Sequence, residues 1–252
     1  FYPVVLQVIL NQLQERGLRG MVLMADRDHD VDELLPQLLE YQVDGIIITS
    51  ATLSTHMATD LAELNIPAVL FNRSVRDSNV AAICCDNRSA ARRIADFFVA
   101  QGFESVGSIA GKENTSTNTE RVGGFTERLL EHGISGLRRA VGNYSYQGGF
   151  DAALQLGKPQ DYPQAIFCAN DIMAMGAMDA IRSQLGLRIP EDVSVVGFDD
   201  IENASWPIYN LTTFRPPIEY MVKRAIENLV NGTAVKATEV LTAELIERGS
   251  TR

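Results

Sequence analysis

Short apolar segments alternate with amphipathic helical patterns along nearly the whole chain. Residues 45–48 (Gly-Ile-Ile-Ile) form a continuous apolar run, which is typical of a strand buried on both faces of a parallel sheet. One face of an early helical pattern is formed by Leu6, Ile9, Leu10 and Leu13. The repeated order of strand, helix and strand predicts parallel strands joined by right-handed crossovers.

The number of strands predicts two subdomains. About ten strands would make one unusually wide sheet, so we expect an α/β fold of two doubly wound parallel-sheet subdomains. The expected strands are residues 20–24, 45–48, 68–71, 81–84, 106–109, 138–142, 165–168, 193–196 and 239–247. Helices are expected from Asp32, at 54–64, from Asp86, and at 119–132, 147–156, 171–185 and 217–231. A break between the two subdomains is expected near residues 84–86, where the first set of strands and helices ends.

The charge of the chain limits its partners. Its 22 Lys and Arg stand against 32 Asp and Glu, a net charge of −10, which repels a phosphate backbone unless the basic residues cluster. Arg88, Arg92 and Arg93 lie close together, but Asp86 and Asp96 share their helical pattern, so we interpret them as a solvated helix face. The chain by itself is therefore predicted to bind nucleic acid poorly.

Composition argues against two further classes of protein. No run of about 18 apolar residues occurs, so no membrane span is expected. The three cysteines have no metal-ligand spacing, and His29, His56 and His132 lie far apart, so we expect no metal site and no cofactor. An odd number of cysteines favours a reducing compartment, and we expect a cytoplasmic protein.

Polar side chains follow strand after strand at the point where each strand ends. These residues are Thr49 and Ser50, Asn72 and Arg73, Asp86, Asn170 and Asp171, and Asp199 and Asp200. Each alone is also explained as a helix cap or a turn residue. Together they place hydroxyl, amide, guanidinium and carboxylate groups at the carboxyl ends of the strands, where such sheets bind ligands. This mixture suits a polyol such as a sugar.

Four stretches carry a family resemblance. Residues 169–177 (Ala-Asn-Asp-Ile-Met-Ala-Met-Gly-Ala) and 189–200 (Ile-Pro-Glu-Asp-Val-Ser-Val-Val-Gly-Phe-Asp-Asp) resemble motifs of the LacI/GalR family of bacterial transcription regulators. Residues 211–214 (Leu-Thr-Thr-Phe) and 121–125 (Arg-Val-Gly-Gly-Phe) are similar to two more, in family order. The resemblance implies a type I periplasmic-binding-protein-like fold, whose two subdomains are joined by three crossovers and close around an effector. It thereby places residues 1–84 with about 216–237 in the first subdomain, and 85–215 with about 238–252 in the second.

The resemblance also implies effector-binding residues. Arg121, Asn170 and Asp199 match family positions that bind effector hydroxyls, and Tyr144 falls where the family places an aromatic ring against the ligand. Weaker matches are Asn72, Thr49, Thr115 and Thr117. Asp86 either contacts the ligand or caps the helix that it opens.

Arg73 bears on the class of effector. If it faces the ligand together with Arg121, two guanidinium groups favour a carboxylated or phosphorylated sugar over a neutral one. If it points outward from the subdomain, a neutral sugar is expected.

The resemblance implies partners as well. Family members bind operator DNA through an N-terminal headpiece, which this sequence lacks, and the strand that usually precedes Phe1 is missing too. We therefore expect an effector-binding and dimerisation core whose first sheet is one strand short, with DNA bound only through the headpiece. Candidate surfaces for a homodimer are two helices that carry Leu6, Leu10 and Leu13, and Tyr220, Met221, Ile226 and Leu229. Core packing explains many of these residues equally well.

Two other functions remain open from the sequence. A periplasmic sugar receptor of a transporter would have nearly the same fold, and the upstream sequence would discriminate it by a signal peptide. An enzyme is not expected, because the chain has no Gly-x-Ser-x-Gly motif, phosphate loop or metal cluster. Residues 122–125 (Val-Gly-Gly-Phe) are interpreted as a helix-packing pattern.

Overall fold

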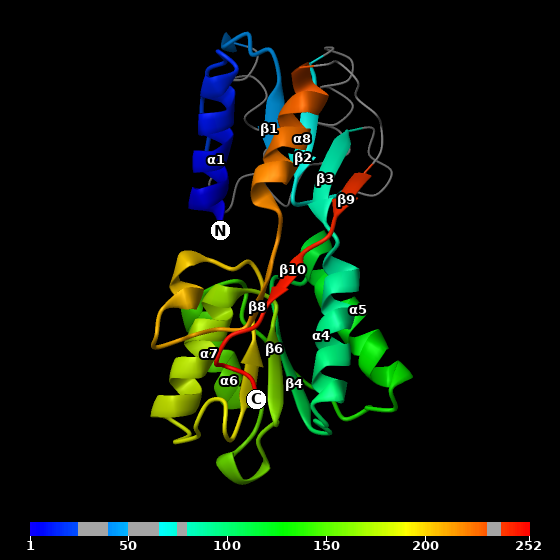
Figure 1. Ribbon diagram of the computed structural model, residues 1–252, viewed down its shortest axis with the longest axis vertical. Coiled ribbons are helices and arrows are strands. Elements are labelled where there is room, and N and C mark those ends of the chain that lie inside the picture. The colour runs from blue at the N-terminus through cyan, green and yellow to red at the C-terminus, as the bar shows by residue number, and fades with distance from the viewer. Residues whose placement is uncertain (25–39, 50–65, 75–79, 231–237) are drawn as a thin grey trace. The chain divides into compact units, whose positions relative to one another are not determined.

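The computed structural model describes residues 1–24, 40–49, 66–74, 80–230 and 238–252 (Figure 1). The chain forms two compact units. Unit 1 consists of Phe1–Cys85 and Pro217–Leu241, and unit 2 consists of Asp86–Pro216 and Thr242–Arg252. The chain therefore passes between the units three times, as the expected fold with three crossovers requires.

Unit 1 contains a parallel sheet. Among the described residues its strand order is β1-β2-β3-β9. The strands are β1 (Ile46–Ile48), β2 (Ala68–Phe71), β3 (Ala81–Cys85) and β9 (Thr238–Leu241). Phe71 and Ile83 in the central strands are at most 1% exposed, because this sheet is apolar on both faces.

Two helices of unit 1 pack against each other, α1 (Tyr2–Glu15) and α8 (Ile218–Val230), and α8 covers β2 and β3. Met221 and Ile226 of α8 are fully buried in this unit. Of the two alternatives for these residues, a dimer surface or core packing, core packing is confirmed for both, because they belong to the face of α8 that packs on the sheet. Leu6, Leu10 and Tyr220 are exposed.

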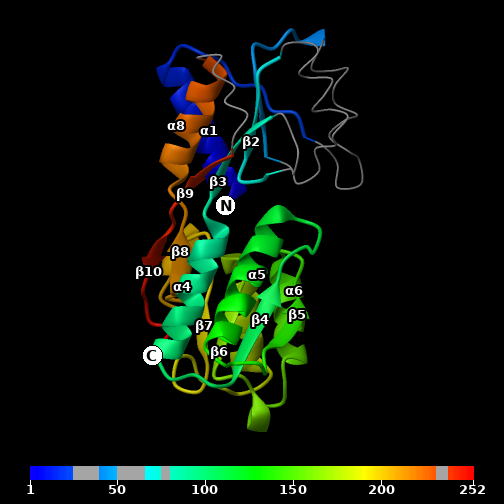
Figure 2. The same ribbon diagram turned by 90° about the vertical axis from the view of Figure 1, so that its right-hand side faces the viewer.

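Unit 2 has the same architecture. Its parallel sheet has the order β5-β4-β6-β7, which can be followed in Figure 2. The strands are β4 (Val106–Ala110), β5 (Arg138–Val141), β6 (Ala165–Cys168) and β7 (Ser194–Val196). Helices α4 (Asn87–Ala100) and α5 (Ser116–Glu131) pack together, as do α6 (Tyr146–Gln155) and α7 (Asp171–Ser183). Figure 1 shows the two pairs on either side of β4 and β6.

Smaller elements complete unit 2. β8 (Thr213–Arg215) pairs with β10 (Glu244–Ile246) in an antiparallel ribbon. Two short 3₁₀ helices, η2 (Pro159–Asp161) and η3 (Glu202–Ser205), lie in connecting loops. The core contains fully buried phenylalanines, and the rings of Phe98 and Phe125 lie edge to face with their centroids 5.7 Å apart.

Each of the helices α4 to α7 begins with a capping side chain. The caps are Asp86, Thr115, Ser145 and Asn170, and each accepts a hydrogen bond from the backbone N–H three residues further on. Such caps satisfy backbone donors that a helix start leaves unpaired. Because these helices follow strands or crossovers, the caps also hold the loops at the carboxyl ends of the strands.

The structure corrects two expected elements. Residues 20–24 do not form a strand, and Met21, Val22 and Met24 are exposed. No described strand pairs with them, and an apolar run without a hydrogen-bonded neighbour does not form a stable strand. The expected strand 239–247 is divided, because β9 pairs with β3 whereas β10 pairs with β8. Thr238–Leu241 thus belongs to unit 1 and not, as expected, with the second subdomain.

The other expected strands and helices are found with small shifts at their ends, except those that lie outside the described residues. The latter are the helix expected from Asp32 and the helix expected at 54–64. In the described part of the chain, no helix combines the length and apolar character that a membrane crossing requires.

Candidate functional site

Arg121 of α5 is the centre of a buried polar cluster in unit 2. It is only 2% exposed. Its Nε donates a hydrogen bond to Asn87 Oδ1 at 2.8 Å, and its Nη1 donates to the backbone oxygen of Ala169 at 2.6 Å. Nη1 also lies 3.3 Å from Asp199 Oδ1, in a buried ion pair. The guanidinium carbon lies 3.6 Å from the ring centroid of Phe198, so one face of the cation is covered.

Two neighbouring strands position Ala169 and Asp199, two of the partners of Arg121. Ala169 directly follows β6, and Asp199 follows β7 after a Gly-Phe turn. Because β6 and β7 are adjacent parallel strands, their carboxyl ends meet at the same edge of the sheet. The backbone N–H of Asp199 donates to Phe214 O at 2.8 Å, which holds the loop.

The backbone of this loop is strained. Asp199 and Asp200 have φ angles of 116° and 49°, in a region that side chains other than glycine rarely adopt. Such strain persists where surrounding contacts hold it, and it gathers at functional sites.

The side chain of Asn170 caps a helix with its oxygen and carries a nitrogen that can donate a further hydrogen bond. Its Oδ1 accepts a hydrogen bond from Met173 N at 3.1 Å, which caps α7. No described residue accepts a hydrogen bond from its Nδ2. The amide nitrogen next to Ala169 is therefore available to a ligand.

The aromatic ring of Tyr144 lies at the carboxyl end of β4. Its ring lies directly against Gly111, where a β-carbon would collide with it. Its hydroxyl lies 3.5 Å from Thr115 Oγ1, the N-cap of α5. Tyr144 and the preceding Asn143 have φ angles of 59° and 52°, a second strained pair at a strand end.

The remaining predicted residues of unit 2 have local roles. Asp86 Oδ1 accepts a hydrogen bond from Ser89 N at 3.0 Å, so it is the N-cap of α4. Thr117 is buried in the first turn of α5. Asp200 is paired with two arginines: its Oδ2 accepts from Arg215 Nε at 2.6 Å and its Oδ1 from Arg248 Nη2 at 2.7 Å.

Asp171 is fully buried and links α7 to two other segments. It accepts hydrogen bonds from Thr213 Oγ1 at 2.6 Å and from Ile201 N at 2.9 Å. Burial, with the negative charge of Asp199, raises the pKa of this carboxyl well above its ordinary value. Asp171 therefore stabilises the loop behind the cluster instead of contacting solvent.

The predicted residues of unit 1 lie at two strand ends. Thr49 directly follows β1, and Asn72 and Arg73 directly follow β2. Since β1 and β2 are adjacent and parallel, these residues share one edge of the sheet. Asn72 is 5% exposed, has a φ of 60°, and donates its backbone N–H to Ile83 O at 2.8 Å. The expectation that they contact an effector stays a prediction.

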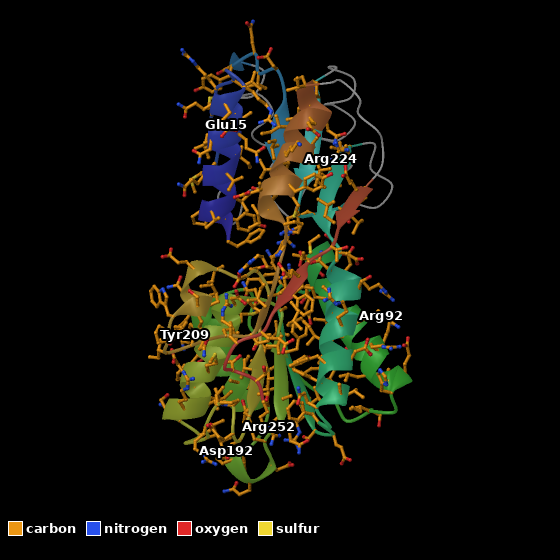
Figure 3. All side chains as sticks on the ribbon, viewed as in Figure 1. Glu15, Arg92, Asp192, Tyr209, Arg224 and Arg252 are labelled. Atoms are coloured by element: carbon orange, nitrogen blue, oxygen red, sulfur yellow. The ribbon has the colours of Figure 1, made fainter. Side chains whose placement is uncertain are left out.

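Two of the three arginines of α4 lie on a solvated face, as interpreted from the sequence, whereas the guanidinium of Arg93 lies over the ring of Phe214. Arg92, labelled in Figure 3, donates to both carboxylate oxygens of Glu131 at 2.9 and 2.7 Å. Arg88 pairs with Glu127. These ion pairs join α4 to α5.

Sequence reasoning missed two members of the Arg121 cluster. Asn87 is the first residue of α4, where the sequence shows only a helix start. Phe198 lies inside a recognised motif, but nothing in the sequence assigns its ring to the face of Arg121. Both contacts arise from the packing of segments that are distant in the chain.

Comparisons with known proteins agree with this architecture. Residues 95–251 match the family of periplasmic binding protein-like domains. The probable HTH-type transcriptional repressor ExuR of Bacillus subtilis is 31% identical over 216 residues, which are 83% of this chain and 65% of that protein. The HTH-type transcriptional regulator AscG of Escherichia coli is 26% identical, over 94% of this chain and 72% of its own length. The chain thus spans somewhat less than two thirds of ExuR.

Solved structures give the same result. A crystal structure of the lac repressor dimer bound to operator and the anti-inducer ONPF has a TM-score of 0.87 at 28% identity. The match covers 98% of this chain and 88% of that one. A complex of the transcriptional regulator CelR with cellobiose has a TM-score of 0.86 at 25% identity, over 99% of this chain and 78% of that one. The chain belongs to the family of periplasmic binding protein-like domains and matches the core of LacI/GalR-type regulators.

Proposed function

We propose that this chain is the effector-sensing core of a LacI-type transcription regulator and that its effector is a sugar or a sugar derivative. One observation carries the proposal. Arg121 and Asp199 form a buried pair at the carboxyl edge of the unit 2 sheet. Beside that pair, Arg121 Nη2 and Asn170 Nδ2 have no hydrogen-bond partner among the described residues.

This set of groups complements a polyol. A sugar hydroxyl both donates and accepts, so it can donate to the carboxylate of Asp199 and accept from Arg121 Nη2 or Asn170 Nδ2. The ring of Tyr144 offers an apolar surface to the C–H face of a pyranose. These groups lie at the ends of parallel strands, where α/β sheets bind their ligands.

Within unit 2 the arrangement favours a neutral sugar. A carboxylate or a phosphate is held best by two parallel N–H groups of a guanidinium. Nε and Nη1 of Arg121 already donate hydrogen bonds to protein acceptors, and the carboxylate of Asp199 balances the charge of Arg121. A sugar acid would therefore need a second cation, which Arg73 supplies if its side chain faces the ligand and not if it points outward.

The proposed activity is control by linkage. An effector that binds one conformation better than another shifts their populations, and this bias would be passed through a homodimer to a DNA-binding headpiece. The relatives named above as transcriptional regulators support this over a transport receptor or an enzyme. Such a regulator acts in the cytoplasm.

A ligand screen tests the proposal. We expect saturating neutral sugar to raise the thermal midpoint of unfolding, since about a hundredfold excess over Kd adds about 2.7 kcal/mol of stability. The panel compares D-glucose, D-galactose and cellobiose with D-gluconate, sugar phosphates and purines. Calorimetric titration then gives the affinity of each compound that shifts the midpoint.

One variant separates binding from folding. Asn170→Ser keeps an oxygen that caps α7 but removes the Nδ2 donors, so affinity should fall roughly 2- to 12-fold, the worth of one hydrogen bond, while stability is kept. Arg139→Ala, a change on the exposed side of β5, is the control and should bind as the wild type does. Binding of purines with no response to any sugar or sugar derivative would contradict the proposal, and binding of sugar phosphates or D-gluconate alone would contradict the preference for a neutral sugar.

A further inference from the structure

Helices α4 and α5 cross so closely that the first residue of α4 reaches Arg121. Gly124 makes the crossing possible, because a β-carbon at this position would lie 2.5 Å from the backbone oxygen of Arg88. Asn87, next to Arg88, is thereby placed beside Arg121 and is only 2% exposed. Asn87 is also the second residue after Cys85, where the chain enters unit 2.

The amide of Asn87 bridges two charged side chains. Its Oδ1 accepts from Arg121 Nε at 2.8 Å, and its Nδ2 donates to Glu120 Oε2 at 3.1 Å. The donor and acceptor of each of these two hydrogen bonds are determined chemically, because a guanidinium only donates and a carboxylate only accepts. Glu120 therefore holds the amide of Asn87 in the one orientation that presents an oxygen to Arg121.

These hydrogen bonds determine where Nη2, the remaining nitrogen of Arg121, points. Asn87 fixes Nε, and the backbone oxygen of Ala169 fixes Nη1. A planar guanidinium held at two of its three nitrogens has no freedom to turn its third. We propose that Asn87, oriented by Glu120, is a positioning residue that aims Nη2 of Arg121 at the effector and so sets the affinity of the site.

This inference rests on the proposed function only where it concerns affinity. The orientation of Arg121 is a property of unit 2 and can be measured without any ligand. A purely structural role for Asn87 would change stability but would leave the affinity of the folded protein unaltered.

The first test follows the Nε–H of Arg121 by nitrogen-15 NMR, with Arg121→Lys assigning the signal. The wild-type proton should exchange slowly with water, because it is buried and hydrogen-bonded. In Asn87→Leu, which has a similar shape and no amide, exchange should be at least tenfold faster. An unchanged exchange rate in Asn87→Leu would overturn the proposal.

The second test reverses the direction of the hydrogen bond between residues 87 and 120. In Asn87→Asp with Glu120→Gln, the new Gln donates to the new carboxylate, which still accepts from Arg121, so slow exchange should return. Asn87→Asp alone places two carboxylates side by side and should exchange faster than the double variant. An Asp at the start of α4 suits the helix dipole, so this set should fold. A double variant that behaves like Asn87→Leu would contradict the bridge.

A third test measures affinity with the sugar of the panel that raises the thermal midpoint of unfolding most. Cellobiose is used if two sugars raise the midpoint equally. Kd should rise about tenfold in Asn87→Leu and return to within about threefold of wild type in the double variant. Equal Kd values for folded Asn87→Leu and wild type would overturn the role in affinity. If no sugar or sugar derivative of the panel binds wild type, the proposed function fails, and the exchange rates still decide whether Asn87 positions Arg121.

Discussion

Gly124 of α5 lies against the backbone of Arg88 in α4, and this contact brings the Arg121 cluster together. The neighbouring Gly123 is different, since a β-carbon there would meet only Arg88 Nη1, at 3.9 Å. Two adjacent glycines in one helix therefore have different tasks. Gly124 permits a close helix crossing, whereas a β-carbon at Gly123 would make only an ordinary van der Waals contact among the described residues.

We predict opposite effects for alanine at these two positions. Gly124→Ala should destabilise the protein by about 1–3 kcal/mol, because the helices must separate to admit a methyl group. Gly123→Ala should stabilise it by up to about 1 kcal/mol, because alanine favours a helix and meets no obstacle. Urea denaturation measures both, and equal effects of the two changes would show that the crossing is not tight.

The buried carboxyl of Asp171 predicts a pH dependence of stability. Because its pKa is raised in the folded state, its proton is bound more tightly there than in the unfolded chain. The stability that this proton gives is complete below the unfolded pKa, about 4, and is lost as pH rises through the raised value. Asn at this position mimics the protonated group and does not titrate.

The stability of Asp171→Asn relative to wild type should therefore increase as pH rises above about 4. Urea denaturation of both proteins at a series of pH values measures the difference, which cancels the titration of all other groups. Parallel pH profiles would mean that Asp171 titrates normally. Asp171→Leu is the control, since it leaves Ile201 N–H and Thr213 Oγ1 without a partner and should be less stable at every pH.

Much of the fold could be predicted from local signals. Apolar runs such as Ala165–Cys168 specify strands, and Asp86 and Asn170 mark helix starts, because both signals depend on neighbours in the sequence. Arg121 was predicted as a site residue only from the family resemblance, whereas Asp199 was also indicated by its position at the end of a strand. The structure places them in an ion pair.

The remaining features depend on contacts between distant segments. Residues 20–24 have the apolar pattern of a strand, but a strand also needs a neighbour, and no local pattern supplies one. The contact between Asn87 and Arg121 joins residues 34 positions apart and depends on the helix crossing at Gly124. Burial of Met221 depends in the same way on which face of α8 meets the sheet.

The ion pairs between α4 and α5 predict an opposite pH effect. Hydrogen bonds from Arg92 and Arg128 lower the pKa of Glu131 to about 2. Because this pKa is depressed on folding, the stabilisation is present above the ordinary value and is lost as pH falls toward 2. Glu131→Gln should therefore lower the thermal midpoint slightly at pH 7, and the difference from wild type should vanish near pH 2. A difference that persists at pH 2 would assign the effect to packing.

The last prediction concerns Asp179, whose Oδ2 accepts hydrogen bonds from the hydroxyls of Tyr146 at 2.7 Å and Tyr209 at 3.0 Å. The hydrogen bond to Asp179, together with partial burial, raises the pKa of Tyr146 to about 12. Asp179→Asn removes the negative charge but keeps an acceptor, so the pKa of Tyr146 should fall toward its ordinary value of about 10.

Carbon-13 NMR of the Tyr146 ring carbon that bears the hydroxyl follows this titration, with Tyr146→Phe to assign the signal. The control is Tyr162, whose hydroxyl donates to Ala153 O at 2.8 Å and has no carboxylate partner among the described residues. Its titration should be the same in Asp179→Asn and wild type. If the pKa of Tyr146 stays near 12 in Asp179→Asn, burial and not the carboxylate is the cause of the shift.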